Sequence, residues 1–193
     1  MTTFTRHQLY PAAMLLILLT LLLGVVYPVA ITAIAQVALP HQANGSLILV
    51  DGKAIGSTLI GQAFDDPKYF SGRLSAAGSD GYDANASAGS NLGPTNQDLI
   101  DRIQASITDF QAANGNAPIP VDLVTTSASG LDAHISPAGA EYQVARVAAT
   151  RGIGADLVRA AVARHTEEPI LGFLGQPRVN VLELNLDLDG LLR

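Results

Sequence analysis

The chain has 193 residues, with 17 acidic and 11 basic side chains, a formal net charge of −6 and no cysteine. An acidic chain without a basic stripe is a poor partner for nucleic acid, and the lack of cysteine excludes disulfides and thiolate chemistry. Hydrophobic residues make up 48% of the chain, and many of them gather near the N-terminus.

Residues 7–50 contain no Asp, Glu, Lys or Arg, and residues 12–38 are almost wholly apolar. At about 1.5 Å per residue, a helix over 12–38 is about 40 Å long, whereas the hydrocarbon core of a bilayer is about 30 Å thick. The sequence therefore predicts a cytoplasmic tail over residues 1–11 and a transmembrane helix over 12–38. Because Pro28 removes one helix hydrogen bond, we expect a kink there.

A cleaved signal peptide is the main alternative for this segment. Arg6 gives a basic start, and Ala33-Ile34-Ala35 has the small-x-small form of a cleavage site. The apolar stretch runs well past the roughly 7–15 residues usual for a signal peptide, which favours a retained anchor. Cleavage after Ala35 would instead give a secreted binding domain.

The distribution of charge predicts the orientation of the span. Arg6 is the only charged side chain before it, and all 17 acidic residues follow it together with the remaining Lys and Arg. The positive-inside rule then keeps the N-terminus in the cytoplasm and exports residues 39–193.

The exported part is long enough for one compact domain. Residues 40–46 form a polar link. Leu47–Val50 and Lys53–Ile60 flank Asp51-Gly52 and predict a β-hairpin, because both residues of such a turn favour positive φ. Residues 75–93 are small and polar, which is typical either of a flexible surface linker or of an ordered loop that grips a neighbouring surface.

Helices are predicted in the second half of the chain. Thr95–Asp98 resembles a capping box, and apolar residues at helical spacing follow over 99–110 until Asn114-Gly115. Ser136-Pro137 opens a helix through about Ala149, since serine caps well and proline suits the first helical position. Gly152 interrupts it, and residues 156–164 form another helix.

Two strands complete the predicted domain. Residues 121–125 form a short strand after a proline-rich break. Leu182, Leu184, Leu186 and Leu188 alternate with polar residues, which predicts a half-buried last strand with its polar face in solvent. Hairpins and helices without regular βαβ alternation indicate an α+β fold.

Residues 125–136 (TTSASGLDAHIS) are the most chemically suggestive stretch. Ser127 or Ser129 with His134 and Asp132 is a conceivable nucleophile–base–acid set, as in a membrane-anchored periplasmic hydrolase. The alternative is a loop whose polar groups satisfy the backbone and cap the next helix; the absence of a GxSxG elbow favours it. The chain has no HExxH, no metal-ligand histidine spacing and no phosphate-binding GxxxxGK[ST], so no metal site is expected.

The same stretch carries a family resemblance. Residues 129–136 (SGLDAHIS), running into Glu141–Gln143 and Arg146-Val147, resemble the signature of the C subunit of the Kdp potassium-transporting ATPase. Further matching motifs follow in order along nearly the whole chain: Gly56-Ser57, Leu59–Gln62, Phe64, Tyr69-Phe70, Gly72-Arg73, Tyr82–Ala84, Ser90–Asn96 and Pro177–Asn180.

This resemblance implies a non-catalytic, single-span accessory subunit of a high-affinity potassium uptake complex in a bacterial inner membrane, with a periplasmic C-terminal domain. Its partners would be a potassium-channel-like subunit, a P-type ATPase subunit and a very small helical subunit, within membrane lipid. The family subunit is needed for assembly and is described as a catalytic chaperone that raises the ATP affinity of the ATPase subunit. ATP and K⁺ would be handled by the partners, with no cofactor bound directly.

One implication conflicts with the predicted orientation. Gln143 resembles the family glutamine proposed to contact nucleotide, yet it follows the only span and therefore lies outside, whereas ATP is inside. We expect Gln143 to be an interface or structural residue and any effect on ATP affinity to be long-range; direct ATP binding through Gln143 is the alternative. The other interface or structural candidates are Gly93, Pro94, Thr95, Asn96, Asp132, His134, Ser136, Tyr142, Arg146, Arg178 and Asn180.

Overall fold

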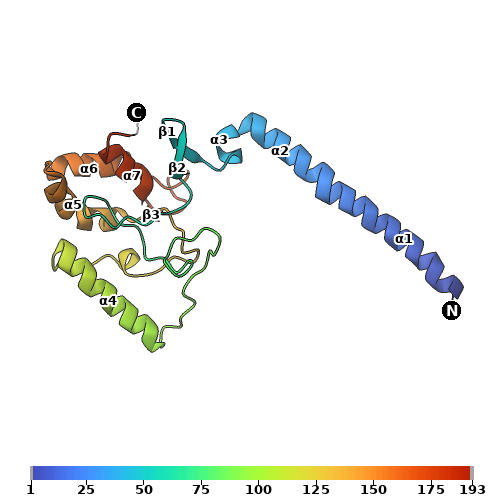
Figure 1. Cartoon of the computed structure of the whole chain (residues 1–193), viewed down its shortest axis with the longest axis horizontal. Helices are drawn as coiled ribbons and strands as arrows, with labels where there is room; N and C mark the ends of the chain where they lie inside the picture. Colours follow the sequence, from blue (N-terminus) through green and yellow to red (C-terminus); the bar gives the residue numbers. More distant parts are fainter. Residues whose placement is uncertain (1, 192–193) are drawn as a thin grey trace. The chain divides into compact units, whose positions relative to one another are not determined.

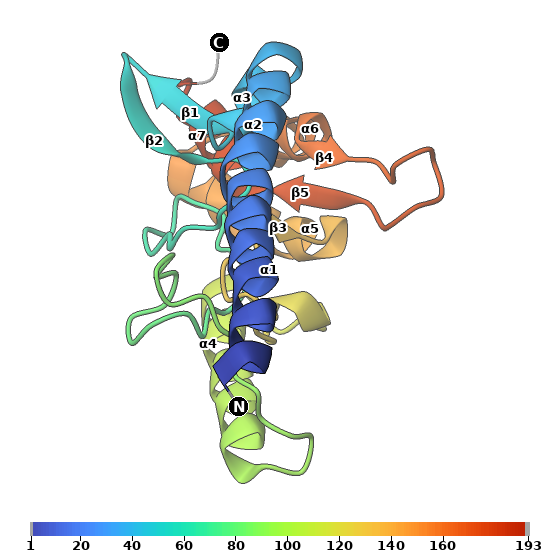
Figure 2. The ribbon, with the colours of Figure 1, turned by 90° about the vertical axis from the view of Figure 1, so that its right-hand side faces the viewer.

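A computed structural model of the chain describes the backbone of residues 2–191 and the side chains of residues 7–191. It divides into two compact units, Met1–Leu47 and Ile48–Arg193. The colours of Figure 1 follow the chain from its N-terminus, with labels on most helices and strands, and Figure 2 labels β4 and β5 as well.

The first unit is helical. It contains α1 (Thr2–Leu21), a π-helical turn η1 (Leu22–Val26), α2 (Tyr27–Ala38) and the short α3 (Pro40–Ala43). His7–Ala38 is long and apolar enough to cross a membrane, its most apolar 18 residues have a mean hydropathy of 2.7, and none of these is buried within the chain. The predicted N-terminal apolar helix is confirmed.

The π-helical turn lies directly before Pro28, where a kink was expected. Pro28 has no N–H, so the carbonyl of Gly24 loses its usual partner four residues on. The helix widens here, and the Tyr27 N–H donates to the Leu22 carbonyl, five residues back. The local disruption therefore takes the form of a π-helical turn.

The polar link over residues 40–46 is partly ordered. The side-chain amides of Gln36 and Asn44 pair reciprocally, with N···O distances of 3.2 and 3.1 Å. The Asn44 amide also donates to the Pro40 carbonyl at 2.7 Å. These bonds fold the link back on the end of α2.

The second unit begins with the predicted hairpin, β1 (Leu47–Val50) and β2 (Lys53–Ser57), which pair with each other. Asp51 and Gly52 have φ values of 50° and 77°, as the turn requires. The hairpin is confirmed, although β2 ends at Ser57 and not at Ile60.

Three predicted helices are present with small shifts at their ends: α4 (Gln97–Asn114), α5 (Pro137–Arg151) and α6 (Ala155–Arg164). The cap of α4 is Asn96, whose side chain accepts from the Asp98 N–H, so this helix begins later than the Thr95 capping box predicts. Ser136 caps α5 as predicted, and Gly152 ends it in a left-handed conformation with φ 66°.

A small antiparallel sheet joins β3 (His134–Ile135), β5 (Arg178–Asn180) and β4 (Thr166–Glu167) in the order β3-β5-β4. His134 pairs with Asn180, and Thr166 pairs with Val179. The core gathers side chains of α5, α6, α7, the sheet, the long segment before α4 and residues 121–123: Phe70, Leu123, Ile135, Ala140, Val144, Val147, Ala148, Val158, Ala161, Val179, Val181 and Leu184. The α+β prediction is confirmed.

The predicted last strand is wrong, because Val181–Leu188 forms helix α7. Asn180 caps it by accepting from the Glu183 N–H at 3.1 Å. In a helix, leucines four residues apart share a face, so Leu182 and Leu186 lie on one side of α7 and Leu184 on the other. All three are buried, so α7 is covered on both sides. Asn185, assigned to the solvent face, is buried.

The short strand over residues 121–125 is also wrong. Val121–Leu123 is a 3₁₀ turn, and the Thr125 hydroxyl donates to the Val121 carbonyl at 2.8 Å. Leu123 and Val124 are adjacent and both buried, which a half-buried strand with alternating faces does not allow. Nearby, Thr126 makes a single parallel bridge with Leu74.

Candidate functional site

Between β2 and α4 the chain forms no helix and no extended strand over residues 58–96, all of which the structure describes. Buried backbone N–H and C=O groups need hydrogen-bond partners, and such a segment cannot supply them itself. Within residues 67–73, called here the clamped segment, many of these partners are side chains of α5 and α7, and the residue that follows α7 bonds a side chain of the segment.

Two buried amides make the central contacts. The Gln143 carbonyl oxygen accepts from the Ser71 N–H at 2.8 Å, and its amide nitrogen donates to the Ser71 carbonyl at 3.1 Å. Asn185 makes the same two-way contact with Phe70, at 2.8 and 2.9 Å. Each amide thus pairs with one residue of the clamped segment much as a neighbouring strand would.

Two arginines of α5 also donate hydrogen bonds to the clamped segment. Arg146 donates to the carbonyls of Pro67 and Tyr69 and, at 2.8 Å, to the Asn114 side chain. Burial lowers the pKa of Arg146. Arg151 donates to the Lys68 carbonyl at 2.8 Å and pairs with Asp189 at 2.8 Å.

Asp189 completes this end of the clamp by accepting a hydrogen bond from the Tyr69 hydroxyl at 2.7 Å. Burial alone would raise the pKa of the Asp189 carboxyl. The hydrogen bonds from Tyr69 and Arg151, together with the positive charge of Arg151, outweigh burial and hold it below its usual range.

This geometry bears on the nucleotide hypothesis for Gln143. The Gln143 side chain is fully buried. Besides Ser71, its amide donates to the Gly139 carbonyl at 3.2 Å, and its carbonyl oxygen accepts from Arg146 at 2.8 Å. A glutamine amide offers two donors and two acceptor sites, so every one is in use inside the fold.

A second group of candidates lies around a pocket of about 310 Å³ whose lining includes Asp132, His134, Ser136 and Arg178. Beside the pocket, two arginines each pair with a carboxylate. Arg73 pairs with Asp132 at 3.2 Å, and Arg178 pairs with Glu167 at 2.7 Å. The His134 ring lies between the two carboxylates, 3.5 Å from Asp132 and 3.6 Å from Glu167.

The carboxyl groups in this row are held in their charged form. Burial would raise the pKa of Asp132, but hydrogen bonds from His134 and Arg73 and the charge of Arg73 lower it overall. Burial likewise opposes ionisation of Glu167, and the hydrogen bond and charge of Arg178 lower its pKa. Both ion pairs therefore persist down to acidic pH.

The hydrolase hypothesis requires His134 to take a proton from Ser127 or Ser129. Both ring nitrogens of His134 instead face carboxylates. Ser129 accepts from the Leu131 N–H at 3.1 Å and lies 3.5 Å from the Ser127 hydroxyl, and Ser127 is itself buried. The arrangement matches the alternative interpretation, a loop whose hydroxyls satisfy local groups.

Ser136 supports that interpretation. Its hydroxyl accepts from the Gly139 N–H at 2.9 Å, and its N–H donates to Asp122 at 2.7 Å. The residue thus joins the start of α5 to the 3₁₀ turn.

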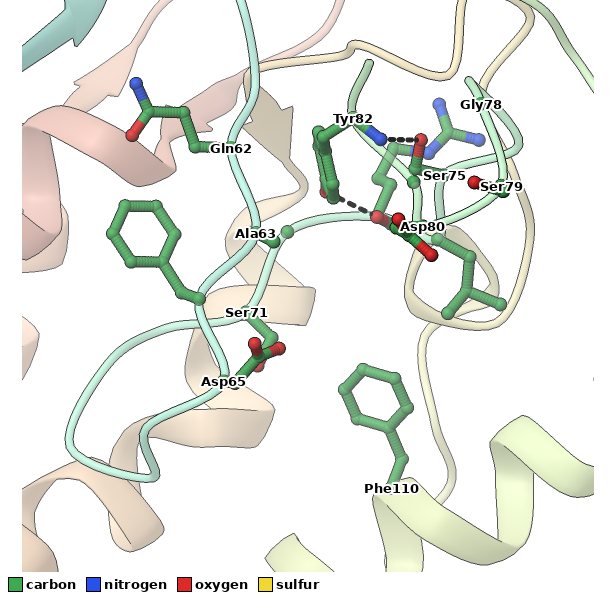
Figure 3. Close-up of a pocket in the computed structure, with 15 residues that line it drawn as sticks. Gln62, Ala63, Asp65, Ser71, Ser75, Gly78, Ser79, Asp80, Tyr82 and Phe110 are labelled. Carbon is green, nitrogen blue, oxygen red and sulfur yellow. Dashed lines mark hydrogen bonds between the residues drawn. The ribbon is translucent and has the colours of Figure 1, made fainter.

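The small polar loop over residues 75–93 is ordered against residues 127–131. Ser75 donates to the Gly130 carbonyl at 2.6 Å, and Ser87 donates to the Ser129 carbonyl at 2.9 Å. Figure 3 shows Tyr82 bonded at both ends, through its N–H to Ser75 and through its hydroxyl to the Arg73 carbonyl, beside a pocket of about 460 Å³. Burial, followed by the charge of Asp132, raises the pKa of Tyr82 to about 12.

The remaining candidates make structural contacts. The Tyr142 hydroxyl donates to the Gly115 carbonyl at 2.8 Å, and the Asn180 amide donates to the Thr58 carbonyl at 2.8 Å. The Asn96 N–H closes a turn onto the Gly93 carbonyl at 3.0 Å. Gly93, Pro94, Thr95 and Asn96 do not line the pocket that joins Asp132, His134, Ser136 and Arg178.

Sequence reasoning missed Asn185, Arg151, Asp122 and Glu167 as site residues. For Asn185 a signal was present: Asn180-Val-Leu-Glu183 has the form of a helix cap followed three residues later by Glu. That pattern predicts a helix after Asn180, and in a helix the alternation that assigns Asn185 to the solvent face no longer applies.

Comparison with known proteins identifies the family. The family model described as "KdpC: K+-transporting ATPase, c chain" matches residues 9–190. The chain belongs to the KdpC family. It is 60% identical over 185 residues to the potassium-transporting ATPase KdpC subunit of Sorangium cellulosum (strain So ce56), covering 95% of this chain and 97% of the relative.

Other KdpC relatives agree. The subunit of Koribacter versatilis (strain Ellin345) is 55% identical, with 96% of this chain and 95% of the relative covered. That of Polaromonas naphthalenivorans (strain CJ2) is 58% identical, with 96% of each covered. As a KdpC family member, the chain is an accessory subunit of a K⁺-transporting ATPase in potassium uptake, and it works with partner subunits.

Proposed function

We propose that the chain is a non-catalytic, single-span subunit that stabilises the potassium-transporting complex from the outer side of a bacterial inner membrane. Its partners are a channel-like subunit, a P-type ATPase subunit and a very small helical subunit. The observation that carries this proposal is the state of Gln143, which is buried with all four hydrogen-bonding sites satisfied.

A buried amide whose donors and acceptors are all hydrogen-bonded has no free group with which to bind a nucleotide. Contact with ATP would require breaking its bonds to Ser71, and each buried group left unpaired costs about 1–3 kcal/mol. Gln143 therefore acts by holding the clamped segment in place. ATP and K⁺ are handled by the partner subunits, and any rise in the ATP affinity of the complex is transmitted over a distance.

The charge distribution supports the same conclusion. Arg6 precedes the span, and all 17 acidic residues follow it. This asymmetry favours a cytoplasmic N-terminus and an exported second unit. The bilayer then separates Gln143 from cytoplasmic ATP.

Topology and assembly are tested together on the full chain. A reporter that is active only outside the cytoplasm is fused after Arg193, and the chain is purified in mild detergent. We expect an active reporter and co-purification of a P-type ATPase subunit and a channel-like subunit. An inactive reporter would contradict the orientation, and a chain that purifies alone would contradict the role in the complex.

ATP binding is tested on the same complex with a photoreactive azido-ATP. We expect labelling of the ATPase subunit, which serves as the positive control, and none of this chain. Labelling near Gln143 that excess ATP prevents would overturn the proposal and favour direct nucleotide contact.

A further inference from the structure

The connection between β4 and β5, residues 168–177, exposes an apolar tip that the contacts described so far leave unused. Four large side chains point outward, and the two most exposed are Leu171 at 82% and Phe173 at 76%. Ile170 and Leu174 are also exposed. Figure 2 shows this connection extending beyond the helices of its own unit; it is called here the apolar finger.

The apolar finger has a defined shape. Ile170 and Leu174 exchange two backbone hydrogen bonds, both of 3.0 Å. Between them Leu171 and Gly172 have φ values of 56° and 78°, the two positive angles of a tight hairpin turn. The finger is therefore a small hairpin whose apolar side chains are already presented.

Leu171 is an unusual residue for this turn. Glycine and asparagine adopt positive φ readily, whereas for a leucine it costs roughly 1–2 kcal/mol. The turn thus holds a large apolar side chain at its apex at the expense of backbone strain. Neither Leu171 nor its three apolar neighbours pack against the core cluster formed within residues 7–191. The folding of the unit alone gives no reason for this arrangement.

We propose that the apolar finger inserts into an apolar cleft on the extramembrane surface of a partner subunit of the transport complex. This inference rests on the proposed function, since it requires the chain to sit in that complex. It deepens that function by assigning the docking element and the chemistry of the surface that receives it.

A protein cleft suits the finger better than lipid does. The finger has Leu and Phe side chains that could enter a membrane interface, but residues 169–177 contain no Lys or Arg to bind lipid headgroups and no Trp or Tyr of the interfacial aromatic belt. At the base of the finger Glu167 and Arg178 pair with each other at 2.7 Å, which leaves the charge of Glu168 unbalanced in an acidic chain. This negative charge opposes approach to anionic lipid. A rigid hairpin also gains most in a shaped cleft, because little conformational freedom is lost on binding.

The finger and the N-terminal helix would act as two attachment points. The exposed apolar area of four side chains is a few hundred Å² at most, below the roughly 800 Å² that each partner buries in a standard interface. Tethering by a membrane span raises the effective concentration of the finger near its partners. A small contact can then contribute strongly to assembly.

The finger's neighbour is identified by photo-crosslinking in the intact complex. The photoreactive residue p-benzoylphenylalanine replaces Leu171 in the full chain, and in a matched control it replaces Leu157, a 66% exposed leucine of α6. We expect a covalent adduct between position 171 and a partner subunit, and none from position 157. Adducts with lipid only, or no protein adduct in a complex that still co-purifies, would overturn the proposal while leaving the proposed function intact.

The strength of the contact is measured with polar variants of the full chain. Leu171→Ser combined with Phe173→Ser should speed dissociation of the chain from the detergent-solubilised complex on the order of 10- to 100-fold, as for loss of central interface residues. Leu157→Ser should leave dissociation unchanged. Equal dissociation rates for the unsubstituted chain, the double variant and Leu157→Ser would overturn the proposed docking role of the finger. An unsubstituted chain that never associates with the complex would instead contradict the proposed function itself.

Discussion

The clamped segment, residues 67–73, and the apolar finger, residues 168–177, are both irregular stretches of the same unit with opposite environments. In the clamped segment, Phe70 is fully buried and its N–H and C=O both pair with Asn185. In the finger, Leu171 and Phe173 point into solvent, and two backbone hydrogen bonds of 3.0 Å join Ile170 to Leu174 within the finger itself.

This difference separates residues that build the subunit from residues free to bind a partner. Buried side chains whose hydrogen-bonding sites are all in use, such as Gln143, stabilise the fold. Exposed apolar side chains on a fixed turn contribute little to folding and can contribute to association. Substitutions in the two stretches should therefore affect different measurements.

The largest expected effect is that of Gln143→Ala on folding. The substitution leaves the Ser71 N–H and C=O without partners, removes a bond to Arg146 and opens a small cavity. At about 1–3 kcal/mol for each buried group left unpaired, the free energy of unfolding should fall by about 3 kcal/mol or more. Urea unfolding of the full chain in detergent, followed by circular dichroism without nucleotide, measures the change.

Gln104→Ala is the matched control, because it removes an exposed glutamine from the middle of α4. It should change the unfolding free energy by less than about 0.5 kcal/mol. If Gln143→Ala unfolded like this control, Gln143 would not be part of a clamp, and the nucleotide hypothesis would regain its basis.

An intermediate loss of stability is expected for a substitution at Gly130, where the polar loop over 75–93 contacts residues 127–131. Gly130 has φ 68°, and a Cβ there would lie 2.6 Å from the Ala88 carbonyl oxygen and 2.7 Å from the Ala77 nitrogen. Gly130→Ala should lower the unfolding free energy by about 2 kcal/mol, because backbone strain and close contact with backbone atoms add.

Gly152 provides a matched control for strain alone. Its φ is 66°, and a Cβ there would meet nothing within 4 Å. Gly152→Ala should cost about 1 kcal/mol. Equal losses for the two variants, measured by thermal unfolding, would show that the loop over 75–93 does not pack closely on residues 127–131.

The sequence predicts local elements well where a turn or a cap determines them. Asp51-Gly52 and Ser136-Pro137 lie where expected because the required φ values and the cap are properties of neighbouring residues. The family could be recognised from its motifs, and the proposal that Gln143 is structural followed from charge asymmetry alone.

Long-range contacts were not predictable in this way. The partners of Gln143 and Asn185 lie 72 and 115 residues away, and no local pattern encodes such distances. The leucine alternation over 182–188 fits a strand by period, but the Asn180 cap and burial against the core favour a helix. The sequence does not single out the apolar finger, because four apolar side chains close together in a sequence indicate nothing about exposure.

The smallest expected effect, and one of opposite sign, is that of Leu171→Asn. Asparagine tolerates the left-handed conformation that strains Leu171, and the side chain it replaces is 82% exposed. The unfolding free energy should therefore rise by about 0.5 kcal/mol while association with the complex weakens. Leu174→Asn, at a position without positive φ, should leave the unfolding free energy unchanged. Urea unfolding of the two full-length variants compares them directly. A loss of stability in Leu171→Asn as large as that of a buried contact would mean that the finger packs within the unit, and the contrast with the clamped segment would disappear.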